Sequence, residues 1–481
     1  MTGNPFPNYI SGTWVCGNNV AANINPSDLD DTIGYYAQAS ALQTAEAIEC
    51  AAAAFPKWRA ISPLVRFEAL DRIGSELLAR VDEMGDMLAR EEGKTLPEAK
   101  AEVHRAGHLF KYFAAEAYRT NGEMYQSLRE GVSLKVVREP IGVVGVITPW
   151  NFPLAIPAWK IAPALAYGNT VVFKPAELVP ASAWMLSDII ARAGLPAGVF
   201  NFVMGTGGDV GGAIVAHPDV SGVTFTGSTP VGRKIGAALF ARGAKMQLEM
   251  GGKNPLVVLD DADLDLAVHC AIQGSYYSTG QRCTASSRLI VTAGIYEKFV
   301  ERLSASVKKL KVGDARVSTT QIGPVVSKAQ LVQDKKYIKE AIADGATLAA
   351  GGNDVTSTTP GYYLSPAVFT DVSPKSALVR DEIFGPIAAV LRVSDYDAAL
   401  ESANDCEFGL SAGIVSRDTA KIDHFSQNSE AGMIQINLPT AGMDFHAPFT
   451  GRKGSSYGAP EKGSYTREFF TAAKVVHEGR G

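Results

Sequence analysis

Residues 142–175 read GVVGVITPWNFPLAIPAWKIAPALAYGNTVVFKP, and this stretch decides the fold. Two apolar, β-rich runs, VVGVIT (143–148) and VVF (171–173), flank a helical stretch at 155–167. Strands that alternate with helices of this length are typical of βαβ units on a parallel sheet. The stretch therefore predicts an α/β unit.

The same alternation continues toward the carboxy terminus. A helical stretch at 181–194 precedes the run FNFV (200–203), and GTGGDVGG (205–212) is interpreted as a loop because it lacks the context of a dinucleotide motif. A second α/β unit is predicted from strands and a long helix further on: strands near 255–259, 288–292, 386–393 and 433–437, and a helix near 295–310.

Toward the amino terminus, residues 44–118 predict helices. The segment is rich in Ala and repeats apolar residues at spacings of three and four. Charge pairs one helical turn apart, Lys94 with Glu98 and Glu102 with Arg105, are expected to support these helices.

Composition narrows the class of protein. The 481 residues are 46% hydrophobic and 20% charged, which suits a globular protein of two or three domains. The net charge of -5 and the absence of a long basic cluster argue against nucleic acid as a partner. The sequence has no secretory signal and no apolar run of the roughly 18 residues that span a bilayer, so we expect a cytoplasmic protein without a membrane partner. The five scattered cysteines predict neither disulfides nor a metal site.

One cysteine stands in an unusual setting. Cys283 lies in GSYYSTGQRCTASSR (274–288), among small polar residues and directly after Arg282. A neighbouring guanidinium would lower the pKa of the thiol and favour a nucleophile, whereas a lone cysteine is also often a buried small side chain. This window alone leaves both interpretations open. The other cysteines are interpreted as buried small side chains: Cys16, Cys50, Cys270 and Cys406.

Two further stretches carry candidate chemistry. In KMQLEMGGKNP (245–255), Glu249 is either a desolvated general base or a surface residue at a strand end, and the residues alone slightly favour the surface. In VTFTGSTPVGRKIG (223–236), a strand leads through small residues into a helix that begins near Pro230. That arrangement fits a phosphate-binding helix terminus or an ordinary turn.

Seven motifs together resemble the NAD(P)-dependent aldehyde dehydrogenase superfamily, in the order of that family and over nearly the whole chain. They are TPWNFP (148–153), FKPAE (173–177), FTGST (225–229), LEMGGKNP (248–255), GQRC (280–283), EIFGP (382–386) and PFTGRKGSSYG (448–458). The resemblance implies two α/β domains with parallel sheets and a small β oligomerisation arm. The implied boundaries are 1–118 and 138–248 for the NAD(P)-binding domain, 249–463 for the catalytic domain, and 119–137 with 464–481 for the arm.

The resemblance also implies the catalytic residues. Cys283 would attack the aldehyde, Asn151 would stabilise the oxyanion, and Glu249 would activate the water that hydrolyses the thioester. Lys160 and Glu461 would relay the proton. Because family members that transfer the acyl group to coenzyme A usually lack the glutamate, Glu249 favours hydrolysis, and the three catalytic residues argue against a non-catalytic homologue.

The implied cofactor is NAD, with NADP possible. Glu177 at the adenosine ribose would repel a 2′-phosphate. The residues implied to contact the cofactor belong to the motifs above: Thr148, Pro149, Trp150, Lys174, Glu177, Gly227, Ser228, Gly251, Glu382 and Phe384.

The implied substrate is a small acidic aldehyde. Arg282 and Arg119 resemble anion-binding positions of the family, although Arg282 could equally be a surface or ion-paired residue. Phe152, Trp159 and Phe449 would complete the pocket. The segment 446–476 most resembles members that oxidise α-ketoglutaric semialdehyde (2,5-dioxopentanoate); succinate semialdehyde, glyceraldehyde 3-phosphate and uncharged aldehydes are the alternatives. A homodimer or homotetramer is expected, and no metal.

Overall fold

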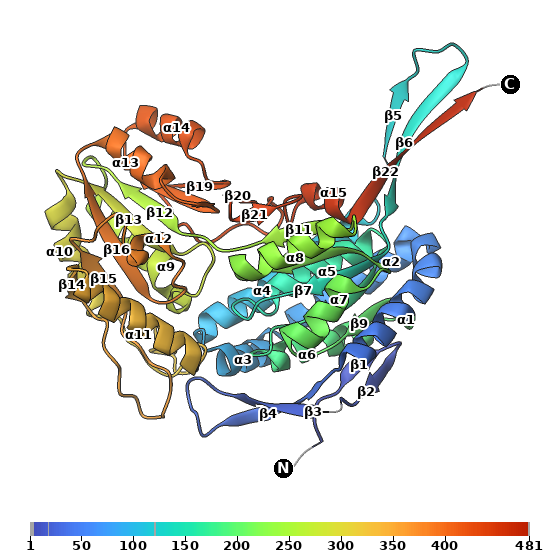
Figure 1. The fold of residues 1–481 in the computed structure, drawn as a ribbon, viewed down its shortest axis with the longest axis horizontal. Helices are drawn as coiled ribbons and strands as arrows, with labels where there is room; N and C mark the ends of the chain where they lie inside the picture. Colours follow the sequence, from blue (N-terminus) through green and yellow to red (C-terminus); the bar gives the residue numbers. More distant parts are fainter. Residues whose placement is uncertain (1–3, 18, 120–121, 480–481) are drawn as a thin grey trace.

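The computed structural model describes residues 4–17, 19–119 and 122–479. Two large sheets, each with helices packed on it, form the body, and a three-stranded sheet projects from it (Figure 1). The predicted α/β architecture is confirmed.

The first large sheet has eight strands in the order β2-β1-β9-β8-β7-β10-β11-β21. Its central strands β9, β8, β7, β10 and β11 are parallel, and both edges are antiparallel. Every residue of β7 and β8 is buried, as expected for parallel strands covered on both faces. The bounds are β1 (Asn8–Ile10), β2 (Thr13–Val15), β7 (Val143–Ile147), β8 (Thr170–Lys174), β9 (Phe200–Phe202), β10 (Val220–Thr226), β11 (Lys245–Glu249) and β21 (Ser456–Tyr457).

Helices cover this sheet. The predicted helical region near the amino terminus divides into four helices, two of which begin at capping boxes centred on Ser40 and Thr95. All residues of the helix after β7 are buried, because it lies between the sheet and the preceding helices. The bounds are α1 (Ala41–Ala60), α2 (Pro63–Ala79), α3 (Val81–Glu92), α4 (Leu96–Glu116), α5 (Ala155–Ala166), α6 (Pro180–Ala191) and α8 (Thr229–Ala241).

The loop predicted for 205–212 is wrong. The structure has a π-helix at Gly207–Gly211 that continues into α7 (Gly212–Ala216). Thr206 caps it, because its hydroxyl accepts a hydrogen bond from the Asp209 N–H at 3.0 Å. A threonine cap thus sets a helix start that the glycines obscured.

The second large sheet has seven strands in the order β14-β15-β16-β13-β12-β18-β19, all parallel except β14. The strands are β12 (Asn254–Val258), β13 (Ser286–Thr292), β14 (Thr347–Ala350), β15 (Ala367–Thr370), β16 (Ile387–Val393), β18 (Ser411–Val415) and β19 (Met433–Ile436). The helices around it are α9 (Leu264–Ser275), α10 (Tyr296–Val307), α11 (Lys328–Ala343), α12 (Ala377–Arg380), α13 (Tyr396–Asn404) and α14 (Thr419–Asn428).

The projecting sheet joins segments far apart in the chain. It consists of β5 (Glu123–Gln126), β6 (Val132–Pro140) and β22 (Thr471–Gly479), and β22 ends near its tip (Figure 1). β5 and β22 lie within the two segments predicted for the arm, and β6 extends past the predicted end at 137 to Pro140. Residues 120–121 and 480–481 of these segments lie outside the described residues. The domain boundaries stay a prediction, and one detail differs: β21, expected with the second unit, pairs with β11 at the edge of the first sheet.

Candidate functional site

Two cavities meet at Cys283. The larger is about 1010 Å³ and the smaller about 260 Å³, and Cys283 and Ile156 line both. A reactive group on Cys283 therefore faces a compartment on each side. Every residue predicted to contact the cofactor lines the larger one: Thr148, Pro149, Trp150, Lys174, Glu177, Gly227, Ser228, Gly251, Glu382 and Phe384.

The sheet explains why these residues gather. In the parallel register, Ile147 lies opposite Lys174, and Thr226 lies opposite Glu249. The carboxyl ends of β7, β8, β10 and β11 thus meet at one edge, which is where open α/β sheets bind ligands. Gly227 and Ser228 follow β10 there and lead into α8, whose first-turn N–H groups suit an anion.

The larger cavity also presents unpartnered polar atoms. Among the described residues, the hydroxyls of Thr148 and Thr226 are buried without a hydrogen-bond partner, and both residues line the cavity. A buried polar group without a hydrogen-bond partner costs free energy, so these two hydroxyls indicate a ligand that would form hydrogen bonds with them.

Glu177, at the rim of this cavity, is exposed. Its carboxylate accepts a hydrogen bond from the Gly207 N–H at 2.8 Å.

Glu382 is held against the glycines of the MGG motif. It accepts a hydrogen bond from the Gly252 N–H at 2.8 Å, and a Cβ on Gly251 would lie 2.3 Å from its carboxylate. A side chain at position 251 would therefore displace the Glu382 carboxylate. Phe384 has a φ of 64° and packs edge-on against Trp150 with ring centroids 5.4 Å apart.

The turn before Cys283 is tightly wound. Ser278, Thr279 and Gly280 have φ of 52°, 57° and 66°, a left-handed conformation that costs free energy for residues other than glycine. Glu98 holds this turn, because its carboxylate accepts hydrogen bonds from the Ser278 N–H at 2.8 Å and hydroxyl at 2.9 Å. The small polar residues around Cys283 therefore serve a strained loop.

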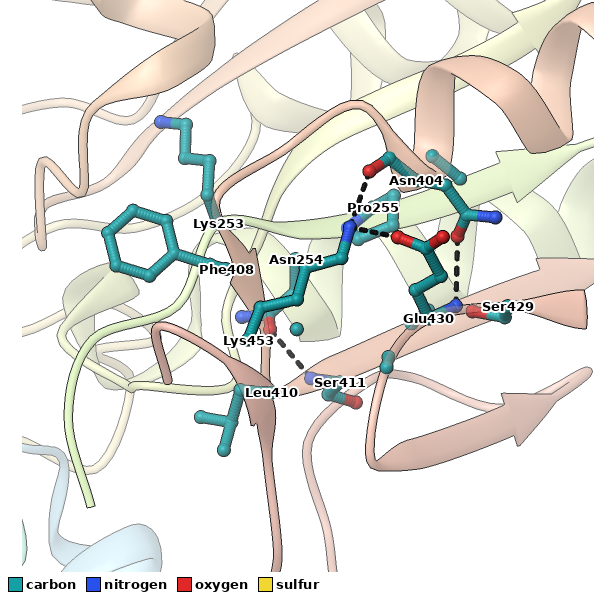
Figure 2. A pocket seen from close by; sticks show the side chains of 14 residues that line it. Lys253, Asn254, Pro255, Asn404, Phe408, Leu410, Ser411, Ser429, Glu430 and Lys453 are labelled. Carbon is teal, nitrogen blue, oxygen red and sulfur yellow. Dashed lines mark hydrogen bonds and ion pairs between the residues drawn. The ribbon is translucent and has the colours of Figure 1, made fainter. Parts of the chain in front are cut away.

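On the other side of Cys283, Asn254 anchors the loop. Its amide donates to the Cys283 carbonyl at 2.8 Å, and its side-chain oxygen accepts from the Ser411 N–H at 2.9 Å. Figure 2 shows the small cavity beside Asn254, where Lys453 contacts Glu430 and the Asn404 carbonyl. Its volume of about 10 Å³ holds at most one water. This cavity is not a ligand site.

The surroundings of Cys283 raise the pKa of its thiol to about 12. Burial is the main cause, and the carboxyl groups of Glu382 and Glu249 add to it. The lowering expected from Arg282 is wrong, because that guanidinium donates to Glu98 at 2.8 Å. Nor are the other cysteines uniformly buried: Cys270 is, but Cys16 is exposed and Cys50 and Cys406 are half-buried.

Glu249 lies at the end of β11 and is only 3% exposed, so the surface interpretation is wrong. Burial and the nearby Glu461 raise its pKa well above the ordinary value. The Ser456 hydroxyl donates to Glu249 at 2.6 Å and opposes that rise. Such a carboxyl group is a stronger base than an exposed glutamate once it is ionised.

Lys160 and Glu461 are in direct contact and fully buried. Lys160 also donates to the Thr224 hydroxyl at 2.8 Å, and the Trp159 indole donates to Glu461 at 2.6 Å. Burial lowers the pKa of Lys160, while Glu461 opposes that change. The structure thus brings the two relay candidates together, close enough to Glu249 to act on its charge.

Asn151 completes the set of catalytic candidates. It is 3% exposed and lines the larger cavity at the loop between β7 and α5. Its side-chain amide donates to the Gln281 carbonyl at 3.0 Å, two residues before Cys283. An amide donor therefore lies beside the nucleophile candidate.

Of the residues predicted to bind the substrate, four line the smaller cavity and one does not. Phe152, Trp159, Phe449 and Arg282 line the smaller cavity. Arg119 lies outside both cavities: it follows the end of α4, is 64% exposed and pairs with Glu116 at 2.9 Å. The expectation that Arg119 reaches the pocket is wrong.

Sequence reasoning missed two cations in the smaller cavity. Arg105 lines it from α4, and burial lowers its pKa. Lys462 is 1% exposed and lies 5.3 Å from the ring centroid of Trp159 and 5.0 Å from that of Phe449. Burial and the nearby Arg105 lower the pKa of Lys462 to about 8. In the sequence, the spacing of Glu98, Glu102 and Arg105 places them on one face of α4, and this pattern could have indicated Arg105.

Within the described ranges, no helix combines the length and apolarity needed to cross a bilayer. No group of three or more His, Cys, Asp or Glu side chains in those ranges is placed to hold a metal ion.

Comparison with known proteins identifies the family. The model of the aldehyde dehydrogenase family matches residues 14–476. The chain is 42% identical to an alpha-ketoglutaric semialdehyde dehydrogenase of Bacillus subtilis and 39% identical to a 2,5-dioxopentanoate dehydrogenase of Saccharolobus solfataricus, each over 98% of both chains. It matches a crystal structure of Staphylococcus aureus betaine aldehyde dehydrogenase in complex with NAD+ with a TM-score of 0.96 and 32% identity, over 98% of this chain and 95% of the other. This chain therefore belongs to the aldehyde dehydrogenase family.

Proposed function

We propose that the protein oxidises a carboxylate-bearing semialdehyde with NAD, and that α-ketoglutaric semialdehyde is its substrate. The observation that carries this proposal is the place of Cys283 between a large cavity and a smaller apolar one that contains Arg105 and Lys462. The two relatives named above act on this aldehyde.

In the first half of the reaction, the Cys283 sulfur adds to the aldehyde carbon and the carbonyl oxygen becomes an oxyanion. The side-chain amide of Asn151, with the backbone N–H of Cys283, stabilises that charge. Because burial raises the pKa of the thiol to about 12, the thiol must lose its proton to a base as it attacks, and the ionised form of Glu249 serves. NAD, when bound, accepts a hydride, and a thioester remains on Cys283.

The proton that Glu249 took from the thiol leaves through Lys160 and Glu461, so that Glu249 is ionised again. In the second half, Glu249 removes a proton from the water that attacks the thioester. The acid product leaves, and the Cys283 thiol is restored. The raised pKa of Glu249 makes it an effective base near neutral pH. Lys160 and Glu461, in contact behind it, pass the proton onward.

The larger cavity fits NAD. Gly227 and Ser228 at the start of α8 would hold the pyrophosphate, Lys174 and Glu177 the adenosine ribose, and Glu382 and Phe384 the nicotinamide ribose. Glu177 favours NAD over NADP, because its carboxylate would repel a 2′-phosphate. The Staphylococcus relative was solved with NAD+.

The smaller cavity supports an acidic substrate. Burial, and after it the nearby Arg105, lowers the pKa of Lys462, so the charged form of Lys462 is disfavoured in this pocket. A substrate carboxylate beside the two cations would offset this cost. Phe152, Trp159 and Phe449 provide the apolar walls. Succinate semialdehyde is the second candidate, because such a pocket discriminates weakly over one carbon unit.

The projecting sheet supports a homodimer or homotetramer. Met124 on β5, Leu128 in the turn after it and Val475 on β22 are exposed apolar side chains on this sheet. Apolar groups gathered on a projecting element mark an association surface. The cytoplasmic location stays a prediction from sequence.

The test compares kcat/KM with NAD for α-ketoglutaric semialdehyde, succinate semialdehyde and uncharged pentanal. We expect both acidic aldehydes to exceed pentanal by about 100-fold or more. If pentanal is the best substrate, the protein is a general aldehyde dehydrogenase.

A further inference from the structure

A buried ion pair lies next to the candidate oxyanion site without lying in it. The ammonium of Lys94 is 2.6 Å from the carboxylate of Glu102, and their side chains are 0% and 1% exposed. Lys94 follows α3 and Glu102 lies in α4, and neither lies in one of the seven motifs. Burying an ion pair costs desolvation free energy, and this cost is offset only when the remaining N–H groups and lone pairs of the two side chains also form hydrogen bonds.

That remaining capacity is used by one loop. Lys94 donates a second hydrogen bond to the Asn151 carbonyl at 2.6 Å, and its ammonium lies 3.9 Å from the centroid of the Phe152 ring. The other carboxylate oxygen of Glu102 accepts the N–H groups of Leu154 at 2.9 Å and Ala155 at 3.0 Å. The pair therefore holds the end of the connection from β7 to α5 and the first residue of α5 (151–155) at three backbone points.

These bonds also replace a missing helix cap. Leu154 stands at the cap position of α5 and makes no side-chain capping bond, so the Glu102 carboxylate satisfies the first N–H groups instead. Because both oxygens of Glu102 are engaged, it is not a free base, although it lines the smaller cavity.

We propose that Lys94 and Glu102 are positioning residues that hold the Asn151 amide where the oxyanion forms. The proposal rests on the function inferred above, since it assigns Asn151 to the oxyanion. A displacement of about 1 Å in a reacting group costs on the order of 100-fold in rate, so a three-point anchor on this loop has a direct kinetic consequence.

The surroundings suit a permanent ion pair. Glu92 lies 4.0 Å from the Lys94 ammonium, and burial raises the pKa of Glu92 to about 8. This rise favours the neutral form of Glu92, which weakens its competition with Glu102 for the Lys94 charge.

A double-mutant cycle tests the proposal. Lys94→Met with Glu102→Gln removes both charges, and the glutamine oxygen can still accept the α5 N–H groups. We expect the single-turnover rate of NADH formation to fall roughly 10- to 100-fold, while the dissociation constant for NAD and the rate of Cys283 alkylation by iodoacetamide change by less than about 2-fold. In an Asn151→Ala background, the same pair of substitutions should cost less than about 3-fold, because the group they position is gone.

The proposal would be overturned if the loss of rate from the two substitutions added fully to the loss from Asn151→Ala. It would also be overturned if the rate of Cys283 alkylation fell as much as the rate of NADH formation, because the pair would then act on the nucleophile loop or on the whole fold. The matched control is Lys111→Met with Asp71→Asn, an ion pair of 2.7 Å between α4 and α2 whose loss should leave the rate unchanged. If the double variant does not fold, Glu102→Gln alone enters the cycle, and additivity with Asn151→Ala overturns the proposal equally. The cycle can use pentanal, so a failure of the acidic-aldehyde proposal is distinguished from a failure of this one.

Discussion

The guanidinium of Arg282 donates a hydrogen bond to Glu98 at 2.8 Å. Arg282 directly precedes Cys283 in the chain, yet the carboxylate of Glu98 neutralises its positive charge. Glu98 also holds the left-handed turn at Ser278, so this ion pair braces the nucleophile loop. The recognition of an acidic substrate then falls to Arg105 and Lys462 in the same cavity.

We expect Arg282→Ala to impair all aldehydes equally. The substitution leaves Glu98 without its cation and loosens the turn before Cys283, so kcat should fall by the same factor for acidic aldehydes and pentanal. The free energy of unfolding in urea should drop by about 1–3 kcal/mol. A loss confined to the acidic aldehydes would instead assign Arg282 to the substrate.

Replacing either pocket cation should remove the preference for acids. Arg105→Met and Lys462→Met each lose a charge-assisted contact worth about 2 kcal/mol, or roughly 30-fold in kcat/KM for α-ketoglutaric semialdehyde, with little change for pentanal. Arg119→Met removes an exposed arginine of the same segment and is the control that should leave all rates unchanged. Equal losses for pentanal would show that these cations support the fold rather than the substrate.

The binding of acidic aldehydes should weaken above about pH 8. The pKa of Lys462 is about 8, below its ordinary value, so the ammonium loses its proton as the pH rises through 8 and no longer attracts the carboxylate. The lowered pKa of Lys462 also means that its charged form destabilises the folded protein. The free energy of unfolding should therefore rise as the pH increases from about 8 to the pKa of this lysine in the unfolded chain. The pH profile of kcat/KM should show this loss for acidic aldehydes, and Lys462→Met should abolish it. A parallel loss for pentanal would contradict the assignment.

Glu249→Gln should impair both halves of the reaction, because it removes the base for the thiol and the base for the water. Without the base for water, hydrolysis of the thioester should slow by about 100-fold or more. Rapid mixing should then show at most one equivalent of NADH per subunit, followed by near arrest. The matched variant Ser456→Ala loses the hydrogen bond that lowers the pKa of Glu249, so the acidic limb of the pH profile should move to higher pH. Full steady-state turnover by Glu249→Gln would exclude it as the base.

Glu177→Gln should improve the use of NADP. The carboxylate is exposed at the larger cavity, and removing its charge relieves the repulsion of a 2′-phosphate. We expect the ratio of kcat/KM for NADP to that for NAD to rise about 10-fold. Glu49→Gln makes the same charge change on α1 and should leave the ratio unaltered. An unchanged ratio in Glu177→Gln would place the discrimination elsewhere.

Local patterns predicted most of the fold. The runs around 143–148 and 171–173 are strands because apolar, β-branched residues suit the interior of a parallel sheet, and α5 lies between them as expected. The segment 205–212 was misinterpreted, because its glycines resemble a loop and the capping hydroxyl of Thr206 is a weak signal in sequence.

The candidate site was only partly predictable. Motif residues such as Cys283 and Glu249 could be chosen because they stand in short contiguous patterns. Arg105 and Lys462 belong to no motif, and their importance comes from burial in a shared cavity. The spacing of the sequence pairs Lys94 with Glu98, whereas in the structure Lys94 is buried and paired with Glu102.

The sequence by itself determined the order of strands and helices and the set of chemical groups, because hydrophobic periodicity and motif spacing act over a few residues. Only the tertiary structure decided which arginine is bound in an ion pair and which carboxyl group is buried. Those properties depend on contacts such as that between Glu98 and Arg282, which lie 184 residues apart, and on burial of groups such as Glu249 that no local pattern encodes.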